Sequence, residues 1–206
     1  MSRAPPLREG SGELTPRGRE GDNSVMAGIG DSLEKAFDFV WGRFIGRLEG
    51  LSDDEYFWEP VPDCWSVRQD AGGRWRIDGD GGGATGKPVP EPAPFTTIAW
   101  RIGHIGLTFI GFGDRLFADG KITIDDVDFP GSARDASAFL DGAYRDWREG
   151  IARIDEQRWW SPIGPAFGPY AKDSTVDLAV HVFDEIVHHG GEVGVLRDLY
   201  LRRDVL

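Results

Sequence analysis

The stretch DLAVHVFDEIVHHGGEVGVLRDLY, residues 177–200, carries three of the four histidines of the chain. Its apolar side chains recur every three or four residues, which predicts one amphipathic helix. They are Leu178, Val182, Ile186, Val193, Leu196 and Tyr200. Glu185 and His189 lie on the same stripe, one turn apart, so both are expected to face the core. Burying a carboxylate without a partner costs free energy, so this pair indicates a site for a compensating charge, most simply a metal ion.

The length and composition indicate one soluble globular domain, because the chain has 206 residues of which 40% are hydrophobic. Its net charge of −12 argues against nucleic acid or an anionic membrane as a partner. The single cysteine, Cys64, excludes an internal disulfide framework, fits a reducing cytoplasm and is too few for a thiolate metal site. The most apolar stretch, residues 97–113, contains Arg101 and His104, so it is interpreted as a core helix and not as a membrane span.

Two segments are predicted to lie outside the helices. Residues 1–27 have no apolar run and are rich in Pro, Gly, Arg and Glu, which predicts a disordered leader, and we hypothesise that translation starts at Met26. Residues 71–94 are dominated by Gly and Pro, which predicts a long surface loop. The domain is expected to cover residues 28–206.

Three further amphipathic helices are predicted upstream of residues 177–200. The first starts at Asp31 or Ser32 and ends near residue 50, the second spans about 96–118, and the third spans about 134–154. A short helical turn is expected within residues 52–60, and residues 122–129 are interpreted as a loop because no second strand is evident. The last helix is expected to start at Ser174 or Thr175. Four long amphipathic helices predict an all-α four-helix bundle.

The four histidines all lie on the predicted second and fourth helices. If these helices are neighbours, His104 can meet Glu185 and His189 to form a set of two histidines and one carboxylate. Such a set suits Zn²⁺ or another divalent first-row metal. Three protein ligands leave a coordination position open, which is typical of catalytic sites rather than structural ones.

Other residues of the fourth helix have two interpretations each. Glu192 is a candidate base or a partner that orients a ligand, although its position also permits exposure to solvent. His181 and His188 adjoin the apolar stripe, so each is a candidate ligand or outer partner, and His188 is also a candidate catalytic residue. A histidine on a helix is more often an ordinary core or surface residue than a ligand. The glycines at 190, 191 and 194 either admit a ligand or permit close helix packing, and the second is favoured.

Two segments resemble a known family: TTIAWRIGH, residues 96–104, and EIVHHGGEVGVLRDLY, residues 185–200, are similar to the DinB/YfiT-like metalloenzymes. EPVPDCWSVR, residues 59–68, adds a resemblance to one branch of that family. The resemblance implies an up-down-down-up four-helix bundle with a metal held by one histidine of helix two and a His-x-x-x-His pair of helix four. His104 matches the first ligand and His189 the last, whereas Glu185 stands where many relatives have histidine.

The Glu-x-x-x-His spacing of Glu185 and His189 resembles that of the mycothiol-dependent maleylpyruvate isomerases, a related group. His188 matches a position that is often histidine in relatives but is not the usual ligand. Relatives with assigned activity are metal-dependent thiol transferases or isomerases that use mycothiol or bacillithiol. The resemblance therefore implies one divalent metal, such as Zn or Ni, a low-molecular-weight thiol and a small electrophilic substrate.

Two other functions stay open at this point. The same metal site could hold water and act in hydrolysis. Alternatively, the metal could only stabilise a non-catalytic binding or stress-associated bundle, in which case a fourth protein ligand is expected. Homodimerisation is plausible for the family.

Overall fold

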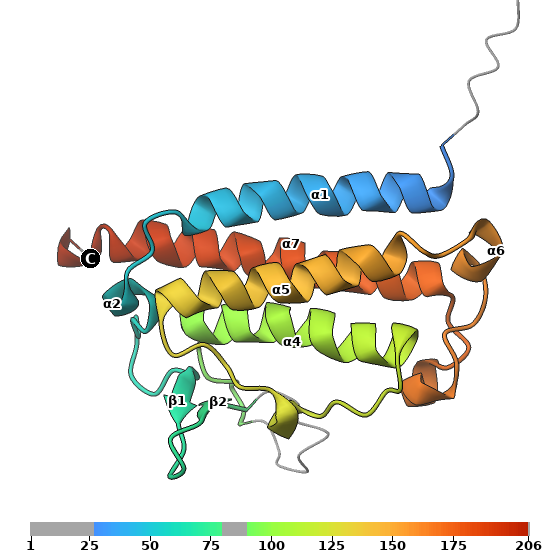
Figure 1. The fold of residues 1–206 in the computed structure, drawn as a ribbon. Helices are drawn as coiled ribbons and strands as arrows, with labels where there is room; N and C mark the ends of the chain where they lie inside the picture. The colour runs from blue at the N-terminus through green and yellow to red at the C-terminus, as the bar shows by residue number, and fades with distance from the viewer. Residues whose placement is uncertain (1–26, 80–89, 206) are drawn as a thin grey trace, which may run out of the picture.

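The computed structural model of the protein describes residues 27–79 and 90–205 and has an all-α architecture (Figure 1). Four long helices form a bundle: α1 Ile29–Leu48, α4 Ile98–Phe117, α5 Ala133–Ile151 and α7 Thr175–Tyr200. The predicted four-helix bundle is confirmed, and each predicted helix agrees with an observed one to within about a turn. The predicted leader lies outside the described residues except for Ala27.

The direction of the helices is up-down-down-up: α1 and α7 run one way, and α4 and α5 run the other way (Figure 1). In the bundle α4 packs against α5 and α7, while α1 packs against α7 and α5. Because α4 and α5 are parallel, residues 118–132 must return along the bundle before α5 can begin. The predicted loop at residues 122–129 lies in this crossover and contains the 3₁₀ turn η1 Ile124–Asp126, without a strand. This order makes the two histidine-bearing helices, α4 and α7, direct neighbours.

Side-chain caps define where three of the long helices start. Thr97 accepts a hydrogen bond from the backbone N–H of Trp100 at the start of α4, and Ser132 accepts one at the start of α5. At α7, Ser174 accepts from the N–H of Asp177 while the Asp177 carboxylate accepts from the N–H of Ser174. This reciprocal capping box satisfies donors that would otherwise lack partners. It fixes the register of the helix that carries Glu185 and His189.

The smaller elements cover the ends of the bundle. They are α2 Asp53–Tyr56, α6 Glu156–Trp159, the 3₁₀ turns η2 Pro165–Tyr170 and η3 Arg203–Val205, and the antiparallel hairpin of β1 Val67–Gln69 and β2 Trp75–Ile77. The short turn expected in residues 52–60 is therefore confirmed as α2. The prediction of a loop throughout 71–94 is wrong for β2. Strands of three residues are too short to show an alternating pattern, and Asp70 closes the turn by accepting from the N–H groups of Gly72 and Arg74.

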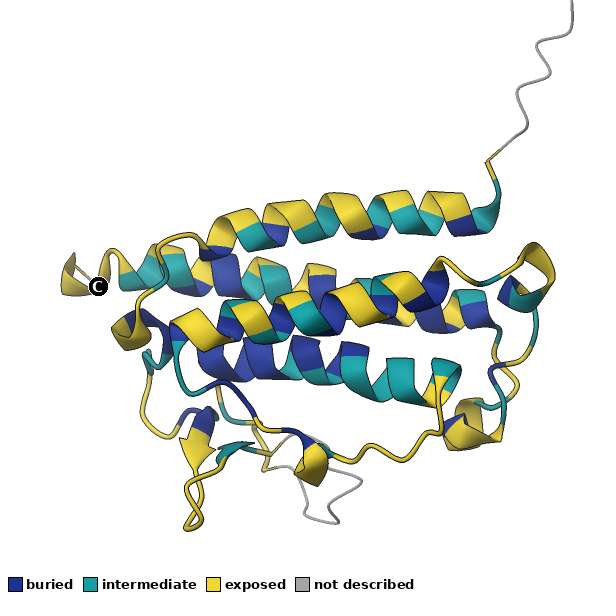
Figure 2. Cartoon of the chain, viewed as in Figure 1, coloured by how far each residue is buried: buried dark blue, intermediate teal, exposed yellow. Residues whose placement is uncertain are grey.

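The core is formed by the inward faces of the four long helices; α1, α5 and α7 each have an exposed outer face, whereas α4 is buried or half-buried along nearly its whole length (Figure 2). Large aromatic rings fill its centre: Trp147 of α5 lies 5.6 Å from Phe117, 6.0 Å from Phe37 and 6.3 Å from Phe109 between ring centroids. None of the helices in residues 27–79 and 90–205 is long and apolar enough to cross a membrane.

One buried ion pair ties α7 to α2. Arg197 of α7 donates to both carboxylate oxygens of Glu55, at 2.7 and 3.3 Å, and the Glu55 side chain is only 4% exposed. The same guanidinium donates to the backbone carbonyls of Arg47 and Glu49 at the end of α1. One side chain therefore neutralises a buried carboxylate and satisfies carbonyls at a helix C-terminus.

We expect Arg197→Ala to lower the free energy of unfolding by about 3 to 5 kcal/mol, because it leaves the Glu55 carboxylate buried without a partner. Urea unfolding followed by circular dichroism measures this loss. The matched control is Arg145→Ala, since Arg145 forms an exposed pair with Asp146 at 3.7 Å, for which a change below about 1 kcal/mol is expected. Equal losses in the two variants would contradict the role assigned to Arg197.

Candidate metal centre

Three side chains predicted as metal ligands meet between α4 and α7. Oε2 of Glu185 lies 2.9 Å from Nε2 of His104 and 3.3 Å from Nε2 of His189. His104 comes from α4, and Glu185 and His189 come from successive turns of α7. Their side chains are 22%, 21% and 13% exposed, so the cluster is largely removed from solvent.

The spacing of the three donor atoms fits a single divalent ion. Zinc binds histidine nitrogens and carboxylate oxygens at about 2.0 to 2.2 Å, so two ligands of one ion lie about 3 Å apart. The two contacts made by Glu185 have this length, and ligand atoms of the three residues all lie within 4.8 Å of one another. Two imidazoles and one carboxylate are also a chemically suitable donor set for Zn²⁺ or Ni²⁺.

The hydrogen-bonding pattern of the His189 ring gives a second test of whether the cluster suits a metal ion. Its Nδ1 lies 2.6 Å from Oε2 of Glu192, while its Nε2 faces Glu185. Burial lowers the pKa of His189 below its ordinary value, so at neutral pH the neutral ring, with one N–H, is favoured. If Nδ1–H donates to Glu192, the lone pair of Nε2 faces a carboxylate oxygen. A cation between these two acceptors would remove that repulsion.

Glu185 is held in the ionised state that a metal ligand requires. The hydrogen bond from His104 lowers the pKa of the Glu185 carboxyl far below its ordinary value, against the effect of burial. A metal ligand must be deprotonated, and both Glu185 and His189 favour that form at neutral pH.

Comparison with known proteins identifies the family. The family model of the DinB superfamily matches residues 74–193, more than half of the chain. The chain belongs to the DinB superfamily. The matched residues include all three members of the cluster, as well as α4 and α5. Neither the curated proteins nor the solved structures gave a match.

In this DinB protein a second layer of charge supports His189. Arg101 of α4 forms an ion pair with Oε2 of Glu192, the oxygen that also contacts Nδ1 of His189. The Arg101 side chain is 8% exposed. Burial lowers the pKa of Arg101 to about 10, which still leaves it cationic at neutral pH. A carboxylate that bonds the outer nitrogen of a ligating histidine fixes the tautomer and orientation of its ring.

Trp100 connects the cluster to the β-hairpin. Its ring stacks on His104, with centroids 4.9 Å apart and planes within 6° of parallel. Its Nε1 donates to the carbonyl of Asp78 at 2.7 Å, and the Asp78 carboxylate accepts from the backbone N–H of Ser66 and from Arg68. Trp100 and Arg101 were not predicted as site residues. Trp100 precedes His104 by four positions and Arg101 precedes it by three, and this helical spacing was the available sequence signal that they share a face with His104.

The remaining two histidines lie on the solvent side of α7. Nε2 of His181 is 3.7 Å from Oε1 of Glu185, and Nε2 of His188 is 3.4 Å from Oε1 of Glu192. Their side chains are 53% and 59% exposed. Each therefore faces the outer oxygen of a glutamate whose other oxygen points to the cluster. Glu192, a candidate base, is already engaged by Arg101 and His189.

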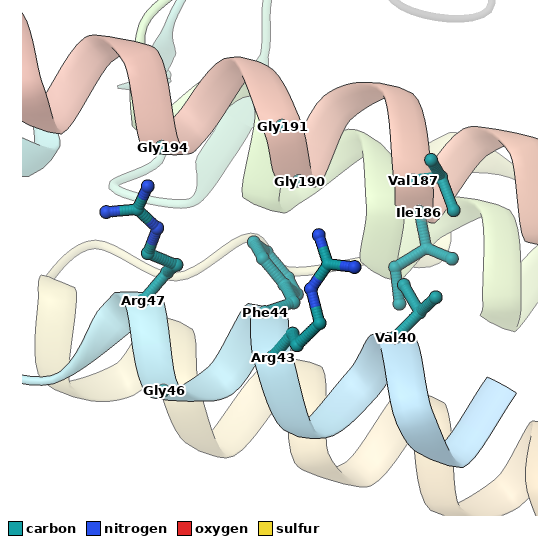
Figure 3. A pocket seen from close by; sticks show the side chains of 10 residues that line it. All are labelled: Val40, Arg43, Phe44, Gly46, Arg47, Ile186, Val187, Gly190, Gly191 and Gly194. Carbon is teal, nitrogen blue, oxygen red and sulfur yellow. The ribbon is translucent and has the colours of Figure 1, made fainter. Parts of the chain in front are cut away.

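The glycines of α7 lie on the side of the helix that faces α1. A groove of about 310 Å³ lies there. Its lining includes the three glycines together with Arg43 and Arg47 of α1 (Figure 3). A Cβ at Gly190 would lie 3.2 Å from Cδ2 of Phe44, which supports the close-packing interpretation at that position. No member of the metal cluster lines this groove.

Cys64 is buried, and its Sγ donates to the carbonyl of Val61 at 3.1 Å. Burial raises the pKa of the Cys64 thiol, so the thiolate is disfavoured at neutral pH. These properties are those of a structural cysteine.

The pair of Arg101 and Glu192 generates a prediction for the metal-free protein. Glu192→Leu should lower the free energy of unfolding by about 2 to 3 kcal/mol, because it leaves a buried guanidinium without its carboxylate. The double variant Arg101→Met, Glu192→Leu should recover most of that loss, since no buried charge remains. Urea unfolding in the presence of EDTA measures the free energy of unfolding of both variants. The single variant Arg101→Met completes the double-mutant cycle. A double variant that loses the sum of the two single losses would show that the two side chains do not interact.

Proposed function

We propose that this DinB-superfamily protein is a divalent-metal-dependent enzyme whose metal is held by His104, Glu185 and His189. The observation that carries the proposal is the convergence of two imidazole nitrogens, one from each helix, on one carboxylate oxygen of Glu185, at 2.9 and 3.3 Å. Sites with three protein ligands leave a coordination position for a reactant, whereas structural sites are closed. The outer histidines, His181 and His188, are mostly exposed and face the glutamates rather than the cluster, which favours an open set of three.

The reaction that we propose is transfer or isomerisation of a small electrophile with a low-molecular-weight thiol, of the mycothiol or bacillithiol type. A bound divalent cation supplies a nucleophile near neutral pH, because it lowers the pKa of a thiol or a water that it binds. Support for a thiol comes from the resemblance of the Glu-x-x-x-His spacing at Glu185 and His189 to the mycothiol-dependent isomerases.

The protein's own residues would act by positioning and by excluding water. Glu192, charge-balanced by Arg101, holds the His189 ring with Nε2 directed at Glu185. Trp100 covers one face of the His104 ring and limits its movement. Such fixed ligands keep a metal centre in one geometry during reaction and reduce reorganisation.

Hydrolysis is the second candidate, because two histidines and a glutamate are also the donor set of hydrolytic zinc enzymes. The same residues would hold the metal, and water would take the place of the thiol. The two functions differ only in the nucleophile, so a thiol-dependence measurement separates them.

Metal content tests the site. Protein purified without an affinity tag and incubated with Zn²⁺, Ni²⁺ or Mn²⁺ should retain close to one tightly bound ion per chain after dialysis, measured by plasma mass spectrometry. His104→Ala and His189→Ala should each weaken binding by more than the roughly 10- to 100-fold typical of outer partners, since each removes a ligand. His181→Ala is the matched control and should keep the ion. A folded wild type without metal would overturn the enzyme proposal and favour a non-catalytic bundle.

Thiol dependence tests the reaction class. Metal-loaded protein screened with small electrophiles should consume them only when mycothiol or bacillithiol is added, and Glu185→Ala should abolish this turnover. Loss of substrate is followed by mass spectrometry. Turnover that is unchanged by the thiol would instead support hydrolysis. Product masses distinguish the cases independently, because thiol transfer adds the thiol, isomerisation leaves the mass unchanged with a shifted chromatographic retention, and hydrolysis adds water.

A further inference from the structure

We propose that α7 carries a second, outer divalent-cation site, formed by His188 and Glu192 on its solvent side and coupled to the inner cluster through Glu192. The site would take an exchangeable first-row cation such as Zn²⁺. Its existence does not require the inner cluster to be catalytic. The claim that it modulates metal binding there rests on the proposed function.

The two outer ligands have a spacing suited to chelation. His188 and Glu192 are four residues apart on one helix, so their side chains project from successive turns on the same side. Nε2 of His188 lies 3.4 Å from Oε1 of Glu192, close to the separation of about 3 Å expected for two ligands of one ion. His188, His189 and Glu192 also form a group whose ligand atoms lie within 4.8 Å of one another.

The outer position is accessible to a hydrated ion. The side chain of His188 is 59% exposed and that of Glu192 is 34% exposed, whereas His189 is 13% exposed. A cation bound there can keep several waters, so two or three protein ligands suffice. The same exposure, and the buried cation of Arg101 beside Glu192, predict weaker binding than at the inner cluster.

Glu192 provides the coupling because its two oxygens face different partners. Oε2 contacts Nδ1 of His189 and pairs with Arg101, while Oε1 faces His188. A cation on Oε1 would draw the carboxylate away from Arg101 and His189, and it would also repel a cation in the inner cluster. Binding at the two sites should therefore be mutually unfavourable, and linkage requires the effect to be reciprocal.

The small number of histidines in the chain allows the outer imidazole ligand to be identified by elimination. The chain has four histidines, and two of them, His104 and His189, face Glu185 at the inner cluster. An outer imidazole ligand must then be His188 or His181. His181 lies 3.7 Å from Glu185, its ring packs against Phe112 with centroids 5.6 Å apart, and it belongs to no group of three donors in the described part of the chain. His181 is therefore the matched control for His188.

The experiment is equilibrium dialysis of the full chain against increasing free Zn²⁺, with bound metal counted by plasma mass spectrometry. The wild type should bind one ion tightly and a second at higher free Zn²⁺. His188→Ala should keep the tight ion and lose the second, and His181→Ala should keep both. His104→Ala should lose the tight ion but keep the weaker one, with affinity raised several-fold because the neighbouring cation is gone.

The outcomes separate the two proposals. A second ion that persists in His188→Ala, or that never binds to the wild type, overturns the outer site and leaves the inner cluster untouched. A tight ion that persists in His104→Ala overturns the inner cluster and not the outer site. Equal outer affinity in the wild type and His104→Ala overturns the coupling through Glu192.

Discussion

The carboxylate of Glu185 is the group on which the candidate metal site between α4 and α7 depends. It lies in the bundle between the Nε2 atoms of two histidines, so its charge must be balanced where water is largely excluded. His104 can do this only if α4 and α7 are adjacent and in one register. The capping hydrogen bonds of Thr97 and Ser174 set where these helices begin, and thus which turn of each meets the other. We propose that a divalent metal ion, bound between Glu185 and the two imidazole nitrogens, balances the remaining negative charge of this carboxylate.

Around this carboxylate the polar groups are arranged in two layers. Glu185, His104 and His189 form the inner layer, and Arg101 with Glu192 supports it from one side. Each glutamate directs one oxygen inward and the other toward an exposed histidine, so α7 presents a similar pair of ligands twice along its length. The inner layer is suited to holding an ion firmly because it is largely removed from solvent. The proposed outer site at His188 and Glu192 is more exposed, so an ion bound there would exchange with solvent. The proposed inner and outer sites together would combine a resident metal with sensitivity to free metal.

The bundle topology brings the helices of this site together and places the β-hairpin beside it. Parallel α4 and α5 require a crossover, and the chain before α4 forms a hairpin whose end is held by Asp78 against Trp100. Membership of the DinB superfamily agrees with this architecture over residues 74–193. Family membership does not choose the reaction, since one fold supports many chemistries. The donor set and the open ligand count are therefore the grounds for the proposed metal-dependent chemistry.

Residue pattern alone was enough to predict the four helices, because each buries a continuous apolar stripe, and it placed Glu185 and His189 on one face of the last helix. His104 could join them only on the condition that its helix is a neighbour, which the tertiary structure decided. The hairpin was missed because three-residue strands carry too little periodicity, and part of its stability comes from Asp70 and Asp78 contacts. The pairing of Arg101 with Glu192 joins residues 91 positions apart on two helices, so it could not be read from local spacing. Helical periodicity determines which face of a helix is buried. Only packing in three dimensions determines which side chains of two helices meet, because that depends on their relative register and rotation.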